Sequence, residues 1–236
     1  MAEQNRLVQY LRYAIGEIVL VVIGILIALQ INSWNEKRIA KLQEKRILKD
    51  LHEEFEMNLL LLDSCFQHNQ KVMDANKEIM ELIADEGRNI AETTFDKILF
   101  ESLEQTNYFP SQNSITELIQ SGKMQYLSNE KIKVLLYKWA SSMDRSRDAF
   151  LGVDGKAEQD IVPYLSEFYP LKDMDMHGPL QWQKVSRLSV NKLQILDQIQ
   201  FENLIDDQIY RLDRYLSNLA ELRAILVEIL EASELK

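Results

Sequence analysis

The sequence predicts an all-α protein: one N-terminal transmembrane helix that continues into a stalk helix, followed by an antiparallel helical bundle. Three observations support this fold class. Apolar residues recur at spacings of three and four over long stretches, as on one face of a helix. The 236 residues include only seven Gly and four Pro, and no alternating run of β-branched residues reaches strand length. One stretch near the N-terminus is apolar over the thickness of a bilayer.

We expect four parts along the chain. A short tail over 1–12 precedes a transmembrane helix over 13–33, a stalk helix covers 34–66, and a soluble helical bundle covers 67–236 and ends in a long helix.

The transmembrane helix is predicted from the nineteen residues Tyr13 to Ile31, in which only Glu17 and Gln30 are strongly polar. At about 1.5 Å per residue they span roughly 28 Å, close to the hydrocarbon thickness of a bilayer. Tyr10 and Tyr13 on one side and Trp34 on the other are placed as interfacial anchors. A cleaved signal peptide is the alternative, but a small-residue cleavage site does not follow the apolar run.

Gly16, Leu20, Gly24 and Ala28 recur every four residues and therefore lie along one face of this helix. Gly24 and Ala28 form a pair that allows close helix packing, so we expect a homo-oligomer. Glu17 lies at the edge of this face. It either faces a shared axis of several spans or reaches the headgroups as a structural group.

The stalk begins with basic residues that suit lipid headgroups: Lys37, Arg38, Lys41, Lys45 and Arg46. Its apolar positions predict an amphipathic helix: Leu48, Leu51, Phe55, Leu59, Leu62 and Phe66. Further helices are expected over Lys71–Ala84 and near Thr94–Gln105.

The second half of the bundle is predicted from caps and periodicity. Asn107–Ser114 and Pro170–Gln181 have the composition of loops. Ser114 with Glu117 fits a capping box for a short helix that stops at Gly122, and Ser128 fits the cap of a longer helix. A final long helix, with a coiled-coil-like seam, is predicted from an apolar series: Ile205, Ile209, Leu212, Leu216, Leu219, Leu222, Leu226 and Ile229.

The sequence offers no catalytic set, and we expect neither an enzyme nor a bound cofactor or metal. Gly152–Asp160 lacks the alternating ligands of a calcium loop and is interpreted as a turn. His52 with Glu56, and Asp173, Asp175 and His177, are too few or too local to predict a metal site. Cys65 has no evident catalytic partner, and as the single cysteine it excludes an internal disulfide.

The distribution of charge along the chain indicates which kinds of partner it can bind. The net charge is −10, but residues 1–49 carry a net +4 and residues 50–236 a net −14. So acidic a body repels phosphate backbones, which argues against nucleic-acid binding.

Two stretches carry a resemblance to a known family. "YAIGEIVLVVIGILIALQINSWNEKR" (13–38) resembles the hallmark of an uncharacterised family of single-span Gram-negative bacterial membrane proteins, and "ITELIQSGKMQYLSNEKIKVLLYKW" (115–139) resembles its second recurring block. The resemblance implies an inner-membrane protein with its soluble domain in the periplasm. The positive charges that follow the span favour the cytoplasm instead. The family brings no catalytic residues, because its activity is unknown.

Two functions remain open. The first is a membrane-anchored helical scaffold or accessory subunit, which assembles with itself or docks a protein partner through the bundle. The second is an oligomeric assembly that passes protons or ions past Glu17. A route across the span would need relay groups, and nothing strongly polar follows Glu17 until Gln30, so we expect Glu17 to be structural.

Overall fold

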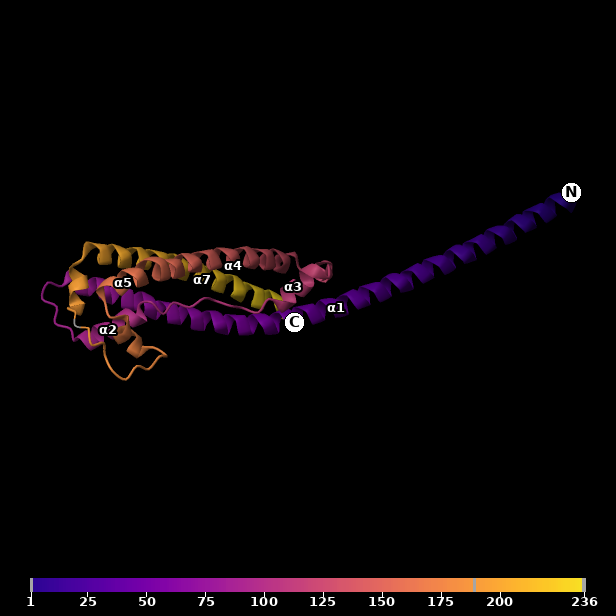
Figure 1. The fold of residues 1–236 in the computed structure, drawn as a ribbon. Helices are drawn as coiled ribbons and strands as arrows, with labels where there is room; N and C mark the ends of the chain where they lie inside the picture. Colours follow the sequence, from indigo (N-terminus) through magenta and orange to yellow (C-terminus); the bar gives the residue numbers. More distant parts are fainter. Residues whose placement is uncertain (1, 189, 235–236) are drawn as a thin grey trace.

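The computed structural model describes residues 2–188 and 190–234, with side chains from residue 16 onward. Its regular elements in these residues are all helical, so the all-α prediction is confirmed. One helix, α1 (Ala2–Ala84), dominates the molecule: its first half projects alone, and its second half lies in a helical bundle (Figure 1).

Three long helices build the bundle. α7 (Ile199–Ser233) packs against both α1 and α4 (Glu130–Lys156). It runs antiparallel to α1, since Arg223 pairs with Asp63 and Ser233 Oγ lies 3.0 Å from His52 Nδ1. The C-terminal end therefore returns to the point where α1 leaves the bundle (Figure 1).

The main core lies between these three helices. The predicted long C-terminal helix is confirmed as α7, and the members of its apolar series from Leu212 to Ile229 are buried. Phe55 of α1 meets Trp139 of α4 edge-on, with ring centroids 5.2 Å apart. Burial along α1 begins at Ile47, inside the stretch for which a stalk is predicted, and Arg46 is still exposed.

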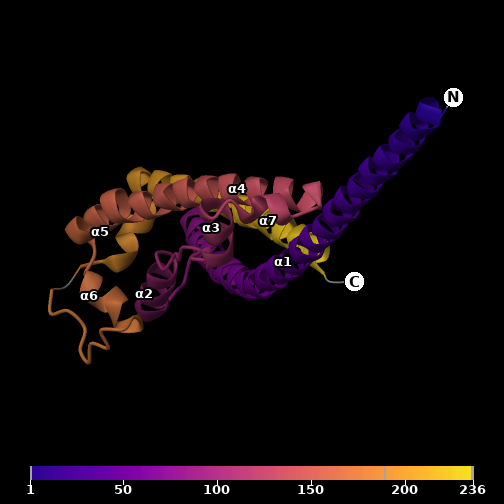
Figure 2. The same cartoon turned by 90° about the vertical axis from the view of Figure 1, so that its right-hand side faces the viewer.

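A second core lies at the end of the bundle far from the N-terminus (Figure 2). The last turns of α1 pack there against α2 (Glu92–Glu101), α5 (Val162–Phe168), α6 (Leu171–Met174) and a 3-10 turn (Lys192–Asp197). The helix predicted separately over Lys71–Ala84 is instead the end of α1, which continues unbroken past Phe66. The helix predicted near Thr94–Gln105 ends earlier, at Glu101.

Local capping differs from the prediction in two places. α3 (Asn113–Gln120) begins before Ser114, whose N–H and hydroxyl bond to Glu54 of α1, while Glu117 pairs with Lys123. The cap of α4 is Asn129, whose side chain accepts the Lys131 N–H, and Ser128 bonds to Glu44. In both cases α1 supplies a carboxylate that the local sequence does not reveal.

Two loop predictions are also corrected. Gly152–Asp160, interpreted as a turn, is helical: α4 runs to Lys156 and continues as a π-helical turn over Ala157–Ile161. Pro170–Gln181 contains α6 and a 3-10 turn over Asp175–His177. The stop at Gly122 is confirmed by its left-handed φ of 69°, followed by a 3-10 turn over Lys123–Tyr126. Glycine reaches this conformation without the steric cost of a side chain.

Candidate functional site

The exposed half of α1 is the first candidate site. Its most apolar 18-residue window has a mean hydropathy of 2.0, and none of that window is buried. By length and composition this helix could cross a membrane, although a signal sequence near an N-terminus passes the same test. Large apolar side chains are exposed around the whole helix, from Ile18 to Ile31.

The predicted residues of this segment all lie on α1, outside the bundle. Gly16, Leu20, Gly24 and Ala28 are exposed, and a Cβ built on either glycine meets no atom within 4 Å. Glu17 and Gln30 are exposed as well, and Trp34 is 66% exposed. The side chains of the other two predicted anchors, Tyr10 and Tyr13, lie outside the described residues.

The predicted basic residues follow immediately and are exposed: Lys37, Arg38, Lys41, Lys45 and Arg46. Arg38 donates to the side-chain oxygen of Asn35 at 3.2 Å. Lys37, Arg38 and Lys41 precede Glu44, the first α1 residue bonded to the bundle among the described contacts, and Arg46 lines a pocket together with Asn113 and Ser114.

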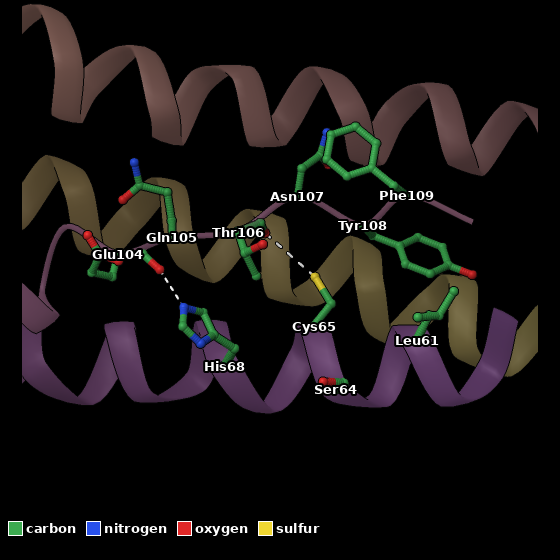
Figure 3. A pocket seen from close by; sticks show the side chains of 10 residues that line it. All are labelled: Leu61, Ser64, Cys65, His68, Glu104, Gln105, Thr106, Asn107, Tyr108 and Phe109. Carbon is green, nitrogen blue, oxygen red and sulfur yellow. Dashed lines mark hydrogen bonds between the residues drawn. The ribbon is translucent and has the colours of Figure 1, made fainter. Parts of the chain in front are cut away.

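A groove beside the main core is the second candidate (Figure 3). It has a volume of about 580 Å³ and lies between α1 and the strap, our name for the irregular segment 102–112 that joins α2 to α3. Leu61, Ser64, Cys65 and His68 line it from α1. His68 Nε2 hydrogen-bonds to the main-chain carbonyl of Glu104.

Three buried asparagines of α1 hold the strap. Asn58 and Asn69 each pair with both main-chain groups of one strap residue, Ser111 and Thr106 respectively, at 2.8–3.1 Å. Asn76 donates to the Ser102 carbonyl at 2.8 Å. A side-chain amide offers the same donor and acceptor as a peptide group, so these side chains replace a β-ladder for the strap. The strap consequently runs antiparallel to α1.

The groove does not favour cysteine chemistry. The Cys65 thiol lies 3.6 Å from the Thr106 carbonyl and 3.7 Å from the Tyr215 hydroxyl. Burial raises the pKa of Cys65, an effect that its bonds to Tyr215 and Asn69 only partly offset. A reactive cysteine needs a lowered pKa, so this thiol acts as a packed core group.

The third candidate is a buried charge cluster in the second core. Lys192 Nζ lies 2.8 Å from an oxygen of Asp96 and 2.8 Å from one of Asp173. The Tyr169 hydroxyl donates to Asp96, and Asp173 accepts the N–H of Ser186. The cluster ties α2 and α6 to the loop that leads into α7.

The pKa shifts in this cluster reflect opposing effects. Burial alone would lower the pKa of Lys192, but its bonds to Asp173 and Asp96 outweigh burial and raise it. Burial alone would raise the pKa of Asp173, yet Lys192 and the Ser186 N–H lower it overall. Both groups are therefore held in their charged forms, which suits a structural ion cluster.

Two of the side chains dismissed as metal ligands have other partners in the structure. His52 Nε2 lies 3.9 Å from Glu56 and its Nδ1 lies 3.0 Å from Ser233 Oγ, while Asp173 pairs with Lys192. Within the described residues, no group of three or more His, Cys, Asp or Glu side chains is placed to hold a metal ion.

Comparison with known families places the chain. A family model matches residues 17–141, more than half of the sequence, and its description is a family of unknown function, DUF6090. The chain belongs to DUF6090. The expectation that the chain belongs to an uncharacterised family is thereby confirmed. No curated protein and no solved structure matches the chain.

In this DUF6090 member, the matched range contains α1 from Glu17 onward and segments that bond to it. It takes in α1 from Glu17, the strap, α3 and the first part of α4. In the described part of the chain, the α1 side chains that bond to segment 102–128 all lie inside it: Glu44, Glu54, Asn58, Cys65, His68, Asn69 and Asn76. Lys192 lies beyond it.

Sequence reasoning missed both the asparagines and the charge cluster. The asparagines lie eleven and seven residues apart, about three and two turns of a helix, on the apolar face of α1. Asparagines at positions where the helical periodicity predicts core residues were the signal that could have revealed their contacts with the strap. For Asp96, Asp173 and Lys192 the sequence gives no local signal, because three separate segments bring them together.

Proposed function

We propose that this protein is a membrane-anchored helical scaffold or accessory subunit, with a non-catalytic role in protein–protein assembly. The continuity of α1 carries the proposal. One unbroken helix has an exposed apolar half and a half built into the bundle core. Such a helix fixes the bundle at a set distance from the anchor.

A lipid bilayer is the partner that we propose for the exposed half. A helix that is apolar on all sides and unburied leaves a large hydrophobic surface in water, which is unfavourable unless lipid or protein covers it. Trp34 and the basic residues from Lys37 to Arg46 follow in the order expected at a membrane interface.

We further propose the inner membrane of a Gram-negative bacterium, with a single span and the bundle in the periplasm. The resemblance of residues 13–38 to the hallmark of such membrane proteins supports this location and orientation. The positive charges after the span argue for the cytoplasm, but a long following domain can be translocated despite its flanking charges.

The native mass of the protein in detergent tests whether it assembles with itself. For the full chain in mild detergent, this mass should exceed that of one protomer, because the exposed small residues Gly24 and Ala28 allow close packing of two copies of α1. Co-purification of native partners from the same detergent extract would then identify further subunits. A monomer that brings down no partner would contradict the scaffold role, and a monomer also cannot enclose an ion path past Glu17.

A further inference from the structure

An exposed apolar patch lies on α1 within the bundle, well beyond the candidate membrane span. Met57, Leu60 and Leu61 are 59%, 63% and 48% exposed, and residues 57–62 carry no charge. Leu61 and the strap residue Phe109, 79% exposed, line the same groove (Figure 3). Buried neighbours such as Phe55 and Leu62 face the core, so this patch is the outer side of α1.

The patch lies on the same side of α1 as Gly24 and Ala28 of the span. An α-helix turns once in about 3.6 residues, so positions 36 apart are separated by about ten full turns and share a side. Leu60 is related to Gly24 in this way, and the exposed Ser64 to Ala28. The bundle packs on the opposite side of α1 and does not obstruct a helix lying against Gly24 and Ala28.

Lipid does not reach this patch when α1 stands upright in the membrane. Leu60 is 26 residues beyond Trp34, which is roughly 39 Å at about 1.5 Å per residue. We therefore expect the patch to be buried against protein and not against lipid. Contiguous exposed apolar side chains of this kind are typical of interaction sites.

We propose that a second copy of this chain docks along this side of α1, with Met57, Leu60, Leu61 and Phe109 as the soluble part of the interface. The inference rests on the proposed membrane anchor, which holds two copies parallel and brings equal residues to equal heights. A two-fold axis along the membrane normal then places each patch against its own counterpart. An uncharged apolar patch is complementary to itself, unlike the acidic surface around it.

Cross-linking tests the docking surface. Leu60→Cys is introduced into the full chain with Cys65→Ala, so that the new thiol is the only one, and the protein in mild detergent is treated with a short bismaleimide. Tyr137→Cys in the same background is the matched control, since Tyr137 of α4 is also an exposed large side chain, at 60%. Thermal melting checks that both variants keep the fold of the Cys65→Ala protein.

We expect Leu60→Cys to give several-fold more covalent dimer than Tyr137→Cys. Equal yields from the two variants in a protein of oligomeric mass would overturn the docking surface while leaving the proposed assembly intact. A monomeric mass together with equal yields would overturn both.

Discussion

Asn58, Asn69 and Asn76 show how single side chains fix an irregular segment. A buried main-chain N–H or C=O without a partner costs free energy, and the strap has no helix or sheet to supply one. Asn69 meets this need at Thr106, and its amide also donates to the Cys65 carbonyl one turn earlier in α1. The residue therefore contributes to the stability of both segments.

Asn69→Ala should destabilise the protein by about 1–3 kcal/mol, because it removes a buried amide and leaves the half-buried N–H of Thr106 without its partner. Urea unfolding of the full chain in detergent, with amide exchange of the strap as a local measurement, checks this. Gln67→Ala, an exposed neighbour on α1, is the control and should change the midpoint little. Equal midpoints for the two variants would contradict the role of Asn69.

In the Lys192 cluster, ion pairing offsets the cost of burying charged side chains. Two buried carboxylates share one ammonium group, and the cluster joins segments that lie about a hundred residues apart. The raised pKa of Lys192 stabilises the fold fully below the unfolded value of about 10.4, and this contribution is lost as pH rises through the higher folded pKa. The lowered pKa of Asp173 stabilises the fold above about pH 3.9, and that contribution is lost as pH falls through the lower folded pKa.

Lys192→Met should cost about 3–5 kcal/mol at pH 7, because it removes the ammonium group that pairs with two buried carboxylates. Those carboxylates then bind protons more tightly in the folded state, so the variant should gain stability as pH falls from 7 towards 5. Urea midpoints across this pH range check the slope. A variant whose midpoint does not rise on acidification would show that the two carboxylates are not buried as described.

At the scale of elements, the sequence predicts the helices whose evidence is local. The periodicity of α7 and the stop at Gly122 follow from spacing and from glycine's conformational freedom. The unbroken run of α1 to Ala84 was missed because "QHNQ" (67–70) resembles a break, whereas Asn69 is buried and bonded to the strap. The caps supplied by Glu44 and Glu54 depend on segments distant in sequence and could not be predicted from local patterns.

The span itself carries a prediction about assembly. Gly24→Ile with Ala28→Ile should lower the oligomer mass in detergent, because branched side chains keep two helix backbones from approaching closely. Gly16→Ile is a useful comparison at the end of the same face. An unchanged mass in the double variant would remove this face from the interface and leave the outer side of the bundle as the site of assembly.

The whole molecule combines two parts with opposite surfaces. The projecting half of α1 is apolar and then basic, whereas residues 50–236 form an acidic bundle with a net charge of −14 (Figure 1). The acidic bundle, with its single buried cysteine, gives no preference between the cytoplasm and the periplasm.

Reporter fusions decide the orientation. Alkaline phosphatase fused after Lys236 should be active, and a fluorescent protein that folds only in the cytoplasm should stay dark, if the bundle is periplasmic. The reverse pair of results would place it in the cytoplasm, as the charges that follow the span favour.

The central claim is that α1 holds this protein in a membrane, and extraction of membranes at high pH with carbonate tests it most directly. We predict that the full chain stays in the pellet, because an apolar span is retained in the bilayer after peripheral contacts are released. N-terminal sequencing of the pelleted protein should give the unprocessed start. A soluble form that begins after Ala28 would contradict the account and identify the apolar segment as a cleaved signal.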